Sequence, residues 1–156
     1  MVRLMVVNGH GGTPPSNARV PDEERGNRPL LHIIEDDGST LLLLEDVARD
    51  SGWTVAGFTR LRDFRGAIER ETPDLIILDD DLPDGRGGDL ARELRSRERM
   101  RDVPLVVCTA AHPMRQAEIT SWAPVIPKPF DLAQIDELLH AAAPAGRRGN
   151  EGQAAG

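Results

Sequence analysis

This sequence lacks the features that would place a chain in a membrane or in an oxidising compartment. Apolar runs such as Leu41–Leu44 and Leu75–Leu78 are four residues long, whereas a membrane-spanning helix needs roughly 20 apolar residues. The single cysteine, Cys108, excludes a disulfide within the chain, and a lack of disulfides is typical of reducing compartments. We therefore expect a cytoplasmic protein that does not enter the membrane.

Basic side chains are fewer than acidic ones. The 19 lysine and arginine side chains are outnumbered by 26 aspartate and glutamate side chains, which gives a formal net charge of −7. An acidic surface repels polyanions, so direct binding of nucleic acid is not expected. With 156 residues, of which 39% are hydrophobic and 29% charged, the chain is long enough to form one domain that buries its own core.

Glycine and proline are concentrated at the two ends of the chain. Residues 1–29 and 144–156 together contain 13 of the 27 glycine and proline residues, and neither segment has a hydrophobic period. Segments of this kind bury too little apolar surface to offset the entropy of ordering them. We predict two flexible tails around one domain at residues 30–143. The 13 residues after this domain are too few for a helix-turn-helix module.

Between the predicted tails, apolar segments alternate with amphipathic segments five times. Strands that are apolar throughout are typical of a parallel sheet that is covered on both faces. The alternation therefore predicts a doubly wound α/β fold of the (βα)5 type. The predicted strands are 30–35, 53–58, 74–79, 104–109 and 125–126, and the predicted helices are 39–51, 60–71, 88–99, 114–121 and 131 to about 140.

Charged and polar residues stand where the predicted strands end. Glu35–Asp37 follows the first strand, Asp79–Asp81 the third, Thr109 ends the fourth and Lys128 follows the fifth. These groups should lie together, because function in a doubly wound sheet gathers at the carboxyl ends of the strands. Clustered carboxylates repel one another unless a cation binds them, and such oxygen ligands suit Mg²⁺. A carboxylate neutralised in this way can attack a phosphoryl group, whose oxygens the lysine and threonine would bind, so the pattern indicates phosphorylation of an aspartate.

Four short segments, in this order, resemble the receiver domains of two-component response regulators. They are Ile34–Asp37, Leu78–Gly87, Cys108–Ala110 and Pro127–Phe130. The resemblance covers residues 30–143. It implies the flavodoxin-like receiver fold, in which five parallel strands are ordered 2-1-3-4-5.

The resemblance also implies roles for individual residues. By position, Asp79, which lies four residues before Pro83, is the phosphoacceptor, and Thr109 and Lys128 contact the phosphoryl group. The implied donor is a phosphohistidine on a sensor histidine kinase or a histidine phosphotransfer protein. The chain is then a single-domain response regulator in a two-component phosphorelay, with an unknown downstream protein target. It is not expected to be an enzyme, apart from the Mg²⁺-dependent gain and loss of its own phosphoryl group.

The resemblance further implies a Mg²⁺ site. Its ligands are the side chains of Glu35, Asp36 and Asp79 and the backbone carbonyl of Asp81. Asp80 and Asp81 add negative charge beside the acceptor, and each charge pair repels by about 1 kcal/mol in water and more where screening is weak. We predict that this extra charge changes the lifetime of the phosphoryl group.

Two features depart from the pattern of the family. Val125 stands three residues before Lys128, where receivers commonly carry an aromatic side chain that turns inward on phosphorylation, and the chain contains no tyrosine. Only 18 residues separate Thr109 from Lys128, and Pro113 and Pro124 lie among them. We therefore predict a shortened fourth helix and do not expect the usual aromatic switch.

The first predicted helix contains four consecutive leucines, Leu41–Leu44. A helix that packs on one sheet cannot bury four consecutive side chains, so two of them should face outward or sideways. In receivers this helix lies beside the active site and meets the kinase. We predict that Leu41 and Leu42 form part of an apolar docking patch. The alternative is that the last helix covers them.

Two other functions remain open at this point. A pseudo-receiver would keep the fold as a protein-interaction module without phosphorylation. Val125 and the short fourth helix favour it, whereas the acidic residues and Lys128 oppose it, and the affinity for Mg²⁺ would separate the two. A phosphatase of the haloacid dehalogenase type is suggested by Asp79–Asp81, which resembles the aspartate-x-aspartate motif of that family. That family carries its motif at the first strand, whereas here it follows the third and continues into Leu82–Pro83.

Overall fold

The computed structural model describes residues 25–145. Five parallel strands form one sheet in the order β2-β1-β3-β6-β7, as the receiver fold implies, so the predicted α/β fold and strand order are confirmed. The strands are β1 (Leu30–Ile34), β2 (Thr54–Phe58), β3 (Leu75–Asp79), β6 (Leu105–Thr109) and β7 (Val125–Pro127).

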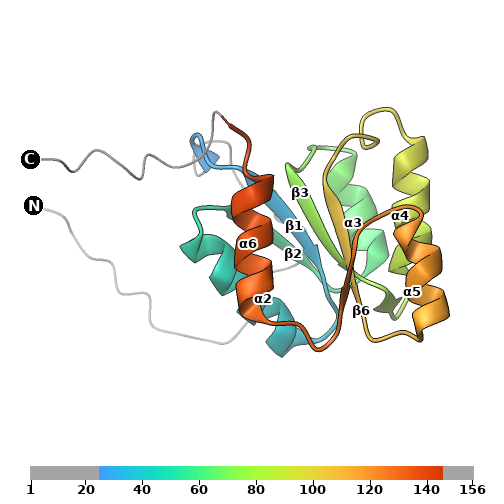
Figure 1. Cartoon of the computed structure of the whole chain (residues 1–156). Helices are drawn as coiled ribbons and strands as arrows, with labels where there is room; N and C mark the ends of the chain where they lie inside the picture. The colour runs from blue at the N-terminus through green and yellow to red at the C-terminus, as the bar shows by residue number, and fades with distance from the viewer. Residues whose placement is uncertain (1–24, 146–156) are drawn as a thin grey trace, which may run out of the picture.

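Five helices cover the two faces of this sheet. In Figure 1, α2 (Gly38–Asp50) and α6 (Leu132–Ala142) lie on one face of the sheet. The other face is covered by α3 (Leu61–Ile68), α4 (Gly87–Ser96) and α5 (Pro113–Thr120). No helix within residues 25–145 is long and apolar enough to cross a membrane.

Each face of the sheet has its own hydrophobic core. Leu44 of α2 and Leu139 of α6 pack against one face together with Ile33 of β1. On the other face, Phe64 of α3 and Leu94 of α4 pack with side chains that include Ile34 of β1. Because neighbouring residues of a strand point to opposite faces, β1 and β3 contribute to both cores, which explains why they are apolar throughout.

The helices α3 and α4 are both shorter than predicted. The helix α3 ends at Ile68, three residues before the predicted end at residue 71. The helix α4 ends at Ser96, because Met100 turns back into the core and is buried there. A continuous helix to residue 99 would not allow that turn.

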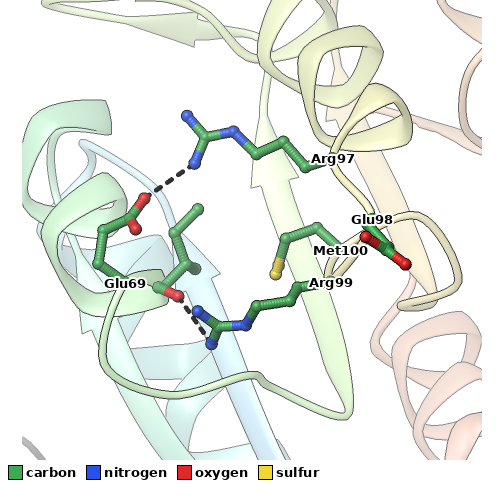
Figure 2. Close-up of a pocket in the computed structure, with 6 residues that line it drawn as sticks. Glu69, Arg97, Glu98, Arg99 and Met100 are labelled. Carbon is green, nitrogen blue, oxygen red and sulfur yellow. Dashed lines mark hydrogen bonds and ion pairs between the residues drawn. The ribbon is translucent and has the colours of Figure 1, made fainter.

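The ends of these two helices enclose a small pocket at the edge of the sheet opposite the carboxyl ends of the strands. Figure 2 shows it lined by charged side chains around Met100. Nη1 of Arg97 lies 3.0 Å from Oε1 of Glu69, and Nη2 of Arg99 lies 3.4 Å from the carbonyl oxygen of Ile68. These contacts hold the turn after α4 against the end of α3.

A short antiparallel hairpin between β3 and α4 is absent from the sequence prediction. Its strands are β4 (Asp81–Leu82) and β5 (Gly85–Arg86). At its turn, the carboxylate of Asp84 accepts hydrogen bonds from the backbone amides of Leu61 (2.9 Å) and Arg62 (3.0 Å). Burial raises the pKa of Asp84, but these hydrogen bonds outweigh it and the pKa is lowered. The hairpin thus caps α3, whose own N-cap residue makes no side-chain cap bond.

Most of the two predicted tails lies outside the described residues. The described part of the first tail, residues 25–29, contacts the domain. Nη1 of Arg25 lies 3.3 Å from Oε2 of Glu71, and the carbonyl of Pro29 accepts a 2.8 Å hydrogen bond from Thr54.

Candidate phosphorylation site

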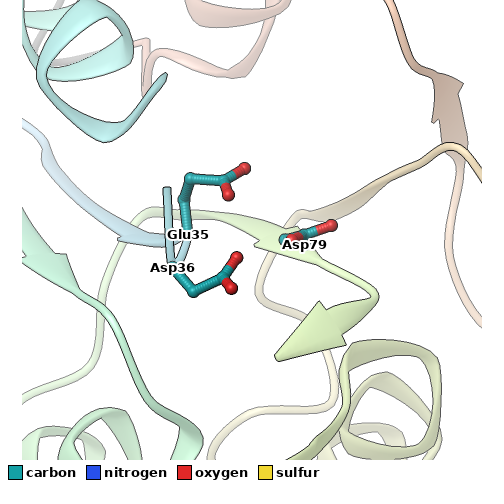
Figure 3. Close-up of side chains that lie close together, drawn as sticks. All are labelled: Glu35, Asp36 and Asp79. Atoms are coloured by element: carbon teal, nitrogen blue, oxygen red, sulfur yellow. The ribbon is translucent and has the colours of Figure 1, made fainter. Parts of the chain in front are cut away.

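Three carboxylates meet at the carboxyl ends of β1 and β3. Glu35, Asp36 and Asp79 each offer an oxygen within 4.8 Å of the others, and Figure 3 shows the three side chains. The pairing of β1 with β3 explains the arrangement. Ile34 lies opposite Leu78, so the residues that follow them, Glu35 and Asp79, are brought together. Glu35 is 3% exposed and Asp79 is 5% exposed, whereas Asp36 is exposed.

Lys128 reaches this acidic cluster from the far edge of the sheet. Its Nζ lies 2.8 Å from Oε2 of Glu35 and 3.3 Å from Oδ1 of Asp79. The backbone of Lys128 is held by a 2.8 Å hydrogen bond from its amide to the carbonyl of Thr109, and its bond to Pro129 is cis. Lys128 is also the only lysine of the chain. One ammonium group therefore faces three carboxylates.

The pKa values of the cluster reflect this excess of carboxylates over ammonium groups. Burial, followed by the charge of Glu35, raises the pKa of Asp79 to about 6, and Lys128 offsets only part of this effect. Burial alone lowers the pKa of Lys128, but its hydrogen bond with Glu35 and the charges of Glu35 and Asp79 outweigh burial and raise it. Lys128 is consequently a fixed positive charge, and the cluster keeps excess negative charge that a second cation would stabilise.

The cluster fits a magnesium ion. Its three side chains offer only hard oxygen donors, which Mg²⁺ prefers, and the site is open to solvent at Asp36. Asp81, whose backbone carbonyl is the fourth predicted ligand, lies next to the cluster, since its backbone amide donates a 3.4 Å hydrogen bond to Oδ1 of Asp79. The role of that carbonyl as a ligand stays a prediction.

Thr109 ends the strand next to β3. Cys108 pairs with Asp79 across the two strands, so Thr109 stands one residue beyond the level of Asp79. Its side chain is buried, and its Oγ1 accepts a 2.9 Å hydrogen bond from the amide of Ala111. The hydroxyl proton stays available for another acceptor.

Asp80, which was expected to add negative charge beside Asp79, is paired with a positively charged side chain. Its side chain is fully buried, and its Oδ1 accepts hydrogen bonds from the amide of Gly88 at 2.9 Å and from Nη2 of Arg115 at 3.1 Å. The sequence analysis missed Arg115 because it lies 35 residues further along the chain. The exposed side chain of Asp81 pairs with Arg86, so its charge is also compensated.

The predicted docking pair on α2 is corrected by the structure. Leu41 is half-buried and packs against the core that includes side chains of α2 and α6. Leu42 is 62% exposed and Leu43 is 45% exposed. The helix buries positions 41, 44 and 48 on one side, which turns the two middle leucines outward. Docking at Leu42 stays a prediction.

Val125 takes part in packing. Its half-buried side chain lies against the core beneath α3, α4 and α5. The helix α5 before it has only eight residues, as the shortened interval predicted.

Comparison with known families identifies the family, which a phosphorylated receiver and a pseudo-receiver would share. A profile described as the response regulator receiver domain matches residues 31–140. The chain belongs to this family. The phosphatase alternative finds no support in that assignment.

Individual receiver proteins are similar to this chain at a lower level. The transcriptional regulatory protein GltR of Pseudomonas aeruginosa is 35% identical over 85 residues, which cover 54% of this chain and 35% of GltR. A solved structure from Chloroflexus aurantiacus, described as a response regulator, has a TM-score of 0.68 at 21% identity and covers 74% of this chain and 97% of its own. The chain thus spans about a third of the length of GltR but nearly all of an isolated receiver structure.

A third relative carries a metal. The receiver domain of the sensor histidine kinase PA1611 from Pseudomonas aeruginosa has a TM-score of 0.64 at 24% identity, and covers 73% of this chain and 96% of its own. Its structure holds a magnesium ion in the active-site cleft. At this identity the likeness establishes the shared fold.

Proposed function

We propose that this receiver accepts a phosphoryl group on Asp79 from a phosphohistidine in a two-component phosphorelay. The donor is a sensor histidine kinase or a histidine phosphotransfer protein. The observation that carries the proposal is the excess of carboxylate charge at Glu35, Asp36 and Asp79 opposite the single Lys128. Such a cluster suits the binding of a cation and a phosphoryl group better than it suits a purely structural role.

The chemistry assigns a separate task to each residue. An oxygen of the Asp79 carboxylate attacks phosphorus, an O–P bond forms, and the P–N bond of the phosphohistidine breaks, so that the imidazole leaves with the electron pair. Lys128 lies 3.3 Å from Asp79, where its ammonium can bind an oxygen of the incoming group. Thr109 can donate its hydroxyl proton to another of these oxygens.

Glu35 and Asp36 serve the metal in this proposal. Together with Asp79 they would hold Mg²⁺, which supplies positive charge that lowers the repulsion between the attacking carboxylate and the phosphoryl oxygens. Glu35 also positions the ammonium of Lys128, because its Oε2 accepts the shorter of the two contacts. The presence of magnesium in the cleft of the PA1611 receiver supports this assignment.

Intact mass spectrometry tests the proposal. The full chain is incubated with acetyl phosphate, with and without Mg²⁺, alongside Asp79→Asn. A single phosphoryl adduct that requires Mg²⁺ and disappears in the variant is the expected result. An adduct that persists in Asp79→Asn, or that forms equally well in the presence of a metal chelator, would contradict the proposal.

A further inference from the structure

The fully buried carboxylate of Asp80 occupies a position directly after the proposed acceptor. It faces away from the acidic cluster and toward the helices α4 and α5. Oδ1 accepts from the amide of Gly88, in the first turn of α4, and both carboxylate oxygens accept from the guanidinium of Arg115 on α5 at 3.1 and 3.3 Å. A single side chain thus joins the end of β3 to two helices.

Arg115 is bound on the other side as well. Its guanidinium lies 3.3 Å from Oδ1 of Asp89 on α4 and 3.0 Å from Oε2 of Glu118 on α5. The hydrogen bond with Asp80 is the largest of several contacts that raise the pKa of Arg115 above its already high value. The arginine is therefore always charged, and it fixes the first turns of α5 relative to α4 and β3.

Gly88 makes this ion pair sterically possible. A Cβ at this position would lie 2.7 Å from Cγ1 of Ile119 and 3.0 Å from Nη2 of Arg115. Any larger residue would require the side chains of Ile119 and Arg115 to shift. The chain thus combines a buried charge, its partner and the space that the pair requires.

The helix α5 is consequently attached to the phosphorylation edge at two points. One is the chain itself, since only residues 110–112 separate Thr109 from the start of α5 at Pro113. The other is the Asp80–Arg115 pair. The side chain of Met114, within α5, is exposed, whereas the ring of Trp122, just after α5, lies 5.0 Å from the guanidinium of Arg92 on α4.

We propose that the ion pair between the buried Asp80 and the half-buried Arg115 couples the position of α5 to the phosphorylation state of Asp79. The inference rests on the proposed function, in which Thr109 contacts the phosphoryl group. When Thr109 is drawn toward that group, the segment before α5 moves with it, while Arg115 stays fixed at Asp80. The helix then turns about Arg115 and changes the orientation of the exposed Met114. This link takes the place of an aromatic side chain at Val125.

Hydrogen–deuterium exchange of the full chain tests this coupling. The wild type is compared, with and without Mg²⁺ and beryllofluoride as a phosphoryl mimic, with Arg115→Gln and with the double variant Asp80→Asn/Arg115→Gln. The double variant leaves no unpaired buried carboxylate, so it keeps the test valid if the single variant does not fold. The matched control is Arg65→Gln, which removes a 2.6 Å contact with Glu93 remote from α5.

In the wild type, the mimic changes the exchange rates of residues 110–122. In the double variant, α5 exchanges about tenfold faster than in the wild type and no longer responds to the mimic, although acetyl phosphate still adds a phosphoryl group to Asp79. The control behaves like the wild type. A double variant in which α5 responds like that of the wild type would overturn the inference and leave the proposed function intact, whereas a wild type that gains no phosphoryl group would overturn both.

Discussion

Two consecutive aspartates at the same edge of the sheet, Asp79 and Asp80, differ in the charged groups that surround them. Both are buried. Asp79 shares Lys128 with Glu35, lies within 4.8 Å of Asp36 and carries a pKa raised to about 6. Asp80 accepts hydrogen bonds from a backbone amide and from an arginine, and a second arginine lies 3.9 Å away. In the proposed function, the excess of negative charge around Asp79 allows this carboxylate to bind a cation and react, whereas the contacts of Asp80 with Arg115 and Gly88 give it a structural role.

The largest effect should come from removing the partner of Asp80. Arg115→Gln removes the nearer countercharge of a fully buried carboxylate and leaves Arg86 3.9 Å away, which should cost up to about 3–5 kcal/mol in the free energy of unfolding. Urea denaturation measures this cost. Arg65→Gln is the control, because its partly exposed pair should contribute less than about 1 kcal/mol. Equal losses in the two variants would show that Asp80 does not depend on Arg115.

Removing the charge of Asp79 should instead raise the free energy of unfolding. The pKa of this carboxyl is about 6 in the folded protein against an ordinary value of 3.8. The folded state therefore holds its proton more tightly, and the charged form costs stability. Without Mg²⁺, Asp79→Asn should be more stable than the wild type by about 2–3 kcal/mol above pH 6. This difference should shrink as the pH falls from about 6 toward 4, which urea denaturation across this range would detect. A constant difference would contradict the raised pKa.

Protons and Mg²⁺ should compete for the acidic cluster. Because Asp79 takes up a proton near pH 6, the affinity for Mg²⁺ should be about tenfold weaker at pH 5 than at pH 7.5. Isothermal titration calorimetry at the two pH values measures the change. Asp36→Asn removes one proposed ligand and should weaken binding at both. Affinity that does not depend on pH would place the metal away from Asp79.

The smallest effect is expected at Asp81. Its exposed carboxylate is paired with Arg86, so its repulsion of a phosphoryl group should be about 1 kcal/mol or less. Asp81→Asn should therefore change the dephosphorylation rate by no more than about fivefold. The decay of the acetyl phosphate adduct measures this rate. An unchanged rate would remove Asp81 from the determinants of phosphoryl lifetime.

Much of the fold was predictable from local patterns. Apolar runs gave the five strands, and the acidic residues after the first and third strands indicated that Glu35 and Asp79 would meet. Their meeting depends only on the pairing of β1 with β3, and this is the reason that the strand ends alone were informative. The helix α4 ended early because Met100 returns to the core, and no local signal marks such a return.

Tertiary partners were much less predictable. Arg115 and Asp80 meet only after α4 and α5 pack side by side, and nothing in the run of three aspartates indicates which one turns inward. Leu41 was assigned to the surface for a related reason, since four identical residues do not reveal which of them face the sheet. Both errors concern which way a side chain faces.

The account depends most directly on which of the three consecutive aspartates reacts. After incubation with acetyl phosphate and Mg²⁺, fragmentation mass spectrometry of the peptide that contains residues 79–81 can locate the adduct. The predicted result is a phosphoryl group on Asp79 alone, because Asp80 is held by Arg115 and Asp81 by Arg86. A phosphoryl group on Asp80 or Asp81 would contradict the claim that incomplete neutralisation selects the reactive carboxylate.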